Sequence, residues 1–113
     1  MKTTPLKGMK DILPREQRIR DYVQGEILKT YRAAGFERIS TPIMEDMENL
    51  DKSDGGDNLN LIFKVLKRGD KLEKALASGS EKELSDMGLR YDLTLPLSRY
   101  YAANREQLPA PFK

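Results

Sequence analysis

The sequence predicts an α+β fold in which helices flank a mixed or antiparallel sheet. From residue 15 to residue 34, apolar side chains recur at steps of three and four, as in a long amphipathic helix. Two β-prone segments follow at 36–45 and 61–68, and a third begins at Gly88 and leads through a turn into a second clear helical pattern. One long helix and several short strands are therefore expected.

Size and composition limit the class of protein. A chain of 113 residues allows one small domain, and 38% hydrophobic with 34% charged residues is typical of a soluble protein. The net charge of +2 is too small to indicate nucleic-acid binding by itself. No apolar run approaches the ~20 residues of a membrane span, and the first residues lack the apolar core of a signal peptide. We therefore expect a cytoplasmic protein that does not contact membranes.

The sequence contains neither cysteine nor histidine. Disulfides, cysteine zinc sites, imidazole metal ligands and Ser–His or Cys–His nucleophiles are thereby excluded. We predict no catalytic residue and no metal site within these residues. Chemistry would have to come from carboxylates, Lys, Arg, Tyr, backbone groups or a ligand bound from outside.

The first helix follows a basic arm at 1–14. Gly35 is placed to end it, because glycine readily adopts the left-handed conformation found after a helix. The apolar stripe is expected to pack against a sheet. It consists of Ile19, Tyr22, Val23, Ile27 and Tyr31.

The segment 36–45 is predicted to be a strand with Pro42 inside it. Proline cannot donate a hydrogen bond to a sheet, so this strand belongs at an edge, at a bulge or at an interface with another chain.

A polar surface loop is predicted at 46–60. Counting from Asp51, the fifth and twelfth positions hold Gly55 and Ile62, so the acidic residues do not form a calcium loop. A strand at 61–68 and a short helix at 71–77 should follow, and the polar stretch from 78 to 86 should be exposed.

The segment 88–96 is the best candidate for function. Asp92 and Thr94 stand two residues apart where the predicted strand meets a helix of Leu95 to about Asn104, so both side chains would share one face. A carboxylate beside a hydroxyl suits an ammonium group, since one supplies charge and the other a directional hydrogen bond. In the alternative, Asp92 caps the helix and Thr94 fills its first turn.

The run from Gly88 to Tyr100 resembles a segment of histidyl-tRNA synthetases, which are class II aminoacyl-tRNA synthetases. The run from Gly8 to Pro14 is similar to the opening motif of that family, and the helix ending at Gly35 followed by the proline-containing strand resembles its motif 1. The resemblance implies a partial class II catalytic fold. It also implies that Asp92 and Thr94, with the Leu93 backbone, bind the α-amino group of histidine.

Further implications concern partners. The resemblance places Pro42 and Ile43 at a homodimer interface. It makes residues 1–113 the N-terminal portion of a catalytic domain, without motifs 2 and 3 and without the anticodon-binding domain. The complete enzyme would use ATP with Mg²⁺ and would charge tRNA(His), whereas these residues alone are expected to be inactive.

Two other functions remain open from the sequence. The first is the synthetase-like regulatory subunit of ATP phosphoribosyltransferase, which shares this architecture without charging tRNA. The second is a dimerisation module with no ligand. The run Tyr91-Asp92-Leu93-Thr94 favours the synthetase.

Overall fold

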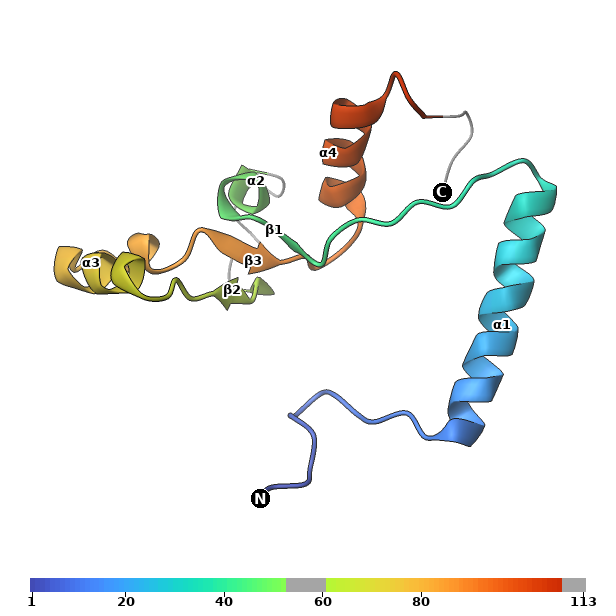
Figure 1. Cartoon of the computed structure of the whole chain (residues 1–113), viewed down its shortest axis with the longest axis horizontal. Coiled ribbons are helices and arrows are strands. Elements are labelled where there is room, and N and C mark those ends of the chain that lie inside the picture. Colours follow the sequence, from blue (N-terminus) through green and yellow to red (C-terminus); the bar gives the residue numbers. More distant parts are fainter. Residues whose placement is uncertain (53–60, 109–113) are drawn as a thin grey trace. The chain divides into compact units, whose positions relative to one another are not determined.

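The computed structural model describes residues 1–52 and 61–108 (Figure 1). The chain divides into two compact units, whose described residues are 1–39 in the first and 40–52 with 61–108 in the second. Within these ranges no helix is both long enough and apolar enough to cross a bilayer.

The first unit contains the long helix α1, Pro14–Ala33, close to the predicted bounds of 15–34. Pro14 occupies the first turn, where a missing N–H costs nothing. Gly35 has φ +90°, which confirms its predicted role as the residue that ends the helix. Just beyond it, the ring of Phe36 meets that of Tyr31 edge-on, with 5.4 Å between centroids.

The apolar stripe of α1 is exposed, and no residue of the helix is buried. The three strands belong to the other unit. The packing of this stripe against a sheet therefore stays a prediction.

The polar side of α1 carries a small exposed ion-pair network. Glu16 accepts hydrogen bonds from Lys10 at 3.0 Å and from Arg20 at 3.2 Å. The hydrogen bond from Lys10, followed by the one from Arg20, holds the pKa of Glu16 below its ordinary value. Because all three side chains are in water, the network contributes little to stability.

The second unit is built on a three-stranded antiparallel sheet in the order β1-β3-β2. The strands are short: β1 is Met44–Asp46, β2 is Lys64–Val65 and β3 is Met87–Leu89. The predicted strands at 36–45 and 61–68 were therefore too long. Both edge strands can pair only along the three residues of β3, and Pro42 lies before β1 rather than inside it.

The predicted loop at 46–60 is wrong at its start, because Met47–Lys52 form the helix α2. The Asp46 carboxylate accepts a hydrogen bond from the Glu48 N–H at 2.8 Å, which satisfies one of the free donors at the helix start. Met47 and Leu50 are buried beneath the helix. The rest of that predicted loop, at 53–60, lies outside the described residues.

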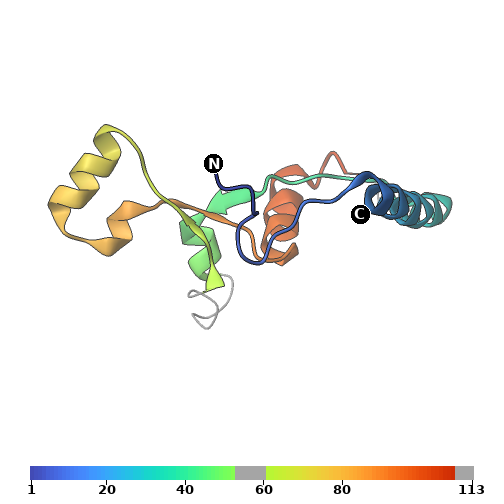
Figure 2. The same cartoon turned by 90° about the horizontal axis from the view of Figure 1, so that it is seen from below.

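Two further helices confirm predictions. Helix α3, Asp70–Ser78, begins after Gly69 and ends at Gly79, both with positive φ. Helix α4 spans Thr94–Asn104. Figures 1 and 2 show α3 beyond the end of the sheet together with the 3₁₀ helix Glu81–Leu84, which lies in the stretch predicted to be exposed.

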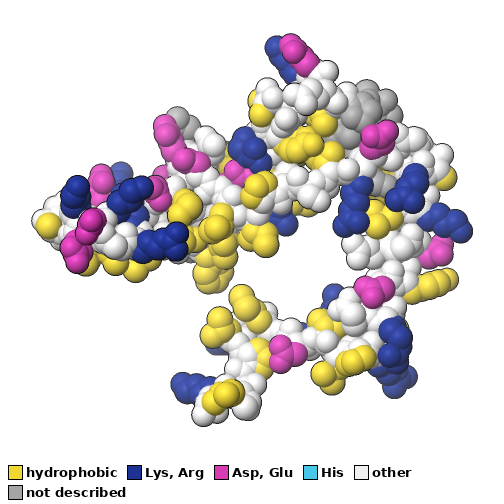
Figure 3. Space-filling view, in the orientation of Figure 1, with side chains coloured by type: hydrophobic (Ala, Val, Ile, Leu, Met, Phe, Trp, Pro, Cys, Tyr) yellow, Lys and Arg dark blue, Asp and Glu magenta, His cyan; other side chains and the backbone are white. Residues whose placement is uncertain are grey.

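The core of this unit lies between α2, the sheet and the start of α4. It consists of Met47, Leu50 and Ile62, with Leu95 packed against them. Gly88 of β3 lies directly beneath, since a Cβ there would be 2.7 Å from the Met47 sulfur and 2.9 Å from a Leu50 methyl. Large apolar side chains, including those of Phe63 and Leu66, remain exposed, and Figure 3 shows hydrophobic side chains gathered over β2.

Candidate functional site

Asp92 and Thr94 lie at the junction between β3 and α4, but not in a strand. β3 ends at Leu89, residues 91–93 form bends, and Thr94 is the first residue of α4. The argument that a strand directs both side chains to one face is therefore wrong. The predicted strand was too long because apolar and aromatic residues continue past Leu89 into the turn.

The capping alternative is wrong for Asp92 and right for Thr94. The N-cap residue of α4 is Leu93, no side chain in the described part of the chain caps the helix, and Thr94 is its first residue. The Asp92 Oδ1 instead accepts a hydrogen bond from the Thr94 N–H at 2.9 Å. The carboxylate can accept further hydrogen bonds, because its two oxygens offer about four lone-pair sites. Both side chains are exposed, so they are open to a ligand.

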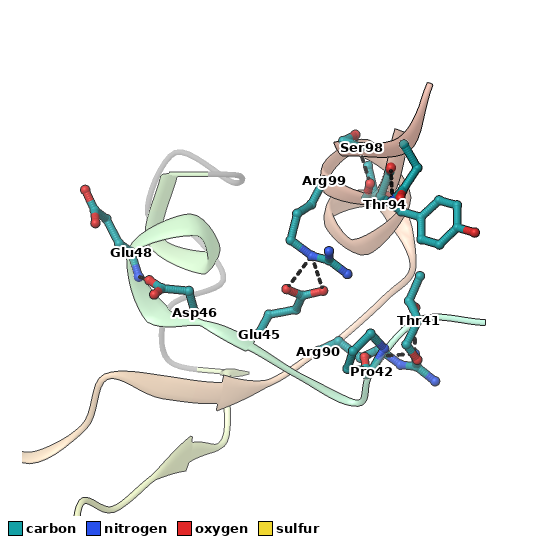
Figure 4. Close-up of polar contacts among 11 residues, drawn as sticks. Thr41, Pro42, Glu45, Asp46, Glu48, Arg90, Thr94, Ser98 and Arg99 are labelled. Carbon is teal, nitrogen blue, oxygen red and sulfur yellow. Dashed lines mark hydrogen bonds and ion pairs between the residues drawn. The ribbon is translucent and has the colours of Figure 1, made fainter. Parts of the chain in front are cut away.

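Arg90 fixes the entrance of this turn. Its backbone N–H donates to the Ile43 carbonyl at 2.9 Å. Its guanidinium Nη1 donates to the carbonyl and the hydroxyl of Thr41, both at 3.0 Å, and to the Pro42 carbonyl at 3.2 Å. Figure 4 shows the Arg90 side chain reaching the chain just before β1.

A buried ion pair fixes the far side of the turn. Arg99 of α4 donates from Nε to both carboxylate oxygens of Glu45, at 3.0 and 2.9 Å (Figure 4). The Glu45 side chain is 5% exposed and the Arg99 side chain 33%. This pair joins α4 to the middle residue of β1. Nothing in the local sequence pattern indicated this pair, because Glu45 stands between Met44 and a second carboxylate, Asp46.

Pro42 and Ile43, the predicted dimer residues, are exposed, and Ile43 retains 63% of its accessible surface. Through Arg90 they are hydrogen-bonded to the residues that lead into the turn of Asp92. The structure therefore brings the two sets of predicted residues into one hydrogen-bonded neighbourhood.

The described residues do not fit a metal ion. In 1–52 and 61–108, no three acidic side chains come together as potential ligands. We therefore derive no step through the Mg²⁺ that accompanies ATP in this family.

Asp92 and Thr94, the residues that the resemblance assigns to histidine, are therefore exposed in the turn that precedes and begins α4. The family model described as "Histidyl-tRNA synthetase" matches residues 8–112. The chain belongs to the histidyl-tRNA synthetase family. The chain is 45% identical, over 97% of its length, to "Histidine--tRNA ligase" of Leifsonia xyli. It is 42% identical over its whole length to "Probable histidine--tRNA ligase" of Tropheryma whipplei.

The chain spans about a quarter of the length of these curated relatives, 26% in both cases. Among solved structures, the histidyl-tRNA synthetase of Nostoc sp. PCC 7120 covers 98% of it with a TM-score of 0.73 at 28% identity. The apo enzyme of S. aureus covers 96% with a TM-score of 0.64, and at 18% identity that likeness concerns the fold alone. These similarities confirm the predicted class: an α+β part of the class II synthetase fold.

Proposed function

We propose that the chain is the N-terminal portion of the catalytic domain of a cytoplasmic histidine–tRNA ligase. This enzyme joins histidine to ATP with release of pyrophosphate and then transfers the aminoacyl group to tRNA(His). The observation that carries the proposal is the match to histidine–tRNA ligases along almost the whole chain. Because these relatives are histidine–tRNA ligases, they support the ligase over the regulatory subunit and over a module without a ligand.

Within this enzyme, we assign the α-amino group of histidine to the turn between β3 and α4. The exposed Asp92 carboxylate supplies the negative charge that an ammonium needs, and the Thr94 hydroxyl supplies a second acceptor. Leu93 lies between them and contributes backbone groups.

In the complete ligase, Asp92→Asn is expected to weaken histidine binding by about ten- to a hundredfold. The substitution keeps the shape and one acceptor but removes the charge, and a charged hydrogen bond contributes about 1.5–3 kcal/mol. Thr94→Val should cost less, about 0.5–1.5 kcal/mol, because it removes a neutral hydrogen bond. Isothermal titration with histidine measures both effects.

Asp70→Asn serves as the control, because Asp70 is a carboxylate at the start of another helix, α3. It should leave histidine affinity unchanged. If Asp92 only stabilises the turn by accepting from the Thr94 N–H, Asp92→Asn keeps an acceptor for that bond, and histidine affinity should also be unchanged. That result would remove the assignment of the amino group.

We also propose that the ligase is a homodimer with Pro42 and Ile43 at its interface. Ile43 exposes 63% of its surface immediately before the edge strand β1, which leaves an apolar side chain for a partner to cover. In a symmetric dimer each such residue counts twice.

Ile43→Asp is therefore expected to raise the dimer dissociation constant by about a hundredfold or more, from the loss of two buried apolar side chains. Analytical ultracentrifugation over a concentration series measures the change. Leu76→Asp is the control, since Leu76 on α3 is 62% exposed and has no assigned partner. Equal dissociation constants for wild type and Ile43→Asp would contradict the interface assignment.

A further inference from the structure

Arg90 attaches the turn of Asp92 to a distant part of the chain by both its backbone and its side chain. The backbone N–H bonds the Ile43 carbonyl, and the guanidinium Nη1 bonds three acceptors on Thr41 and Pro42. Nη1 carries two hydrogens, so at least one of them is shared between acceptors. All four contacts fall on three consecutive residues, 41–43. The attachment thus fixes both the position and the direction of the chain at residue 90.

The attachment lies two residues before Asp92, where the regular structure stops. β3 ends at Leu89 and α4 starts at Thr94, so the carboxylate belongs to a turn that lies between two rigid elements. Asp92 is exposed, and its carboxylate accepts a hydrogen bond from the N–H of Thr94 within the same turn. Its location therefore depends on how the two ends of the turn are held. Arg90 holds one end, and the Glu45–Arg99 pair holds the helix at the other.

We propose that Arg90 is a positioning residue for the amino-group site, holding the Asp92 carboxylate where the ammonium of histidine binds. The inference rests on the proposed function. Arg90 itself does not contact the substrate in this assignment, because its guanidinium is directed to the Thr41–Pro42 backbone (Figure 4).

The arginine side chain is suited to this task in a way that lysine is not. A planar guanidinium presents donors in a fixed fork and loses little freedom for each bond it makes, whereas an ammonium is a flexible point donor. Arg90→Lys would keep the charge and one donor group but lose the fixed direction. Two of the side-chain acceptors are backbone carbonyls, so Thr41→Val removes only the hydroxyl contact and should have the smaller effect.

The test uses the complete ligase and two probes: histidine and 3-(imidazol-4-yl)propionate, which is histidine without its amino group. Arg90→Lys should raise the dissociation constant for histidine by about tenfold and Arg90→Ala by up to about a hundredfold, the cost of displacing a binding group by about 1 Å. Affinity for the analogue should stay within about twofold, because it has no ammonium to misplace. Arg20→Ala, on the exposed network of α1, is the control and should change neither affinity.

Asp92→Asn is measured beside these variants so that the two hypotheses can fail separately. Selective loss of histidine affinity in both Asp92→Asn and the Arg90 variants supports the inference. If only Asp92→Asn loses histidine affinity, the inference about Arg90 is wrong, whereas the assignment of the amino-group site is supported. Equal weakening of both probes by Arg90→Lys shows a general structural role and also overturns it. If Asp92→Asn binds histidine like wild type, the proposed site fails and the inference falls with it.

Discussion

Replacing Glu45 by alanine is expected to lower the free energy of opening of the sheet by about 2–3 kcal/mol, somewhat below the 3–5 kcal/mol typical of breaking a fully buried pair. The substitution removes the carboxylate that accepts from Arg99 and leaves a partly buried guanidinium without its charge partner. The expected loss is smaller than for a fully buried pair because one third of the Arg99 side chain is exposed to solvent.

Hydrogen–deuterium exchange in the complete ligase gives this free energy at the amides that close the sheet. The Leu89 N–H, which donates to the Phe63 carbonyl, and the Arg90 N–H, which donates to the Ile43 carbonyl, are the probes. Glu16→Ala is the matched control, since Glu16 also pairs with an arginine but in water, and it should leave these amides unchanged. A Glu45→Ala variant with wild-type exchange would show that the pair contributes nothing to the sheet.

A double-mutant cycle separates the charge pair from the packing. Glu45→Gln removes the charge at nearly constant volume, and Arg99→Met removes the cation while keeping an apolar side chain. Each single change leaves the other partner without its counter-charge. The double change should therefore lower the free energy of opening by less than the sum of the two single changes. Strict additivity would contradict direct coupling between Glu45 and Arg99.

The helices of this chain were predictable because local signals set their ends. Pro14 and Gly35 bracket α1 within one or two residues, and α4 starts one residue before the predicted Leu95. Proline and glycine act through the backbone at one position, so no distant contact is needed to interpret them.

The strands and α2 were not predictable in the same way. The length of each strand depends on how far β3 runs beside it, and β3 has three residues. Helix α2 arises in a stretch rich in acidic residues because Met47 and Leu50 are buried there. These are tertiary effects that override local propensity.

The sequence predicted only part of the candidate site. Asp92 and Thr94 were predicted because they stand two residues apart and because the segment resembles a known family. Their supports, Arg90 with Thr41 and Arg99 with Glu45, lie 49 and 54 residues apart in the sequence. No periodicity links residues at such distances, so the parts that hold the site emerge only when the chain is folded.

Leu50→Ala is expected to have the largest effect on stability, a loss of about 2–5 kcal/mol in the free energy of opening of the sheet. Leu50 is 1% exposed and lies in the cluster with Met47 and Ile62, against which Leu95 of α4 packs. Truncation would leave a cavity in a core too small to close over it. The same exchange probes in β3 report the change, and Leu76→Ala, at a site 62% exposed, should alter it by no more than about 0.5 kcal/mol.

A substitution at Gly88 tests whether the stability lost in Leu50→Ala reflects close packing or burial alone. A methyl group at position 88 would lie 2.9 Å from Leu50 Cδ1 and 2.7 Å from Met47 Sδ, so Gly88→Ala should by itself cost about 1–3 kcal/mol through overpacking. Once Leu50 is alanine, the same methyl partly fills the cavity, and the flexible Met47 side chain can move aside. Gly88→Ala with Leu50→Ala should therefore cost less than the sum of the two. Additivity within about 0.5 kcal/mol would mean that the two positions do not share one packed space.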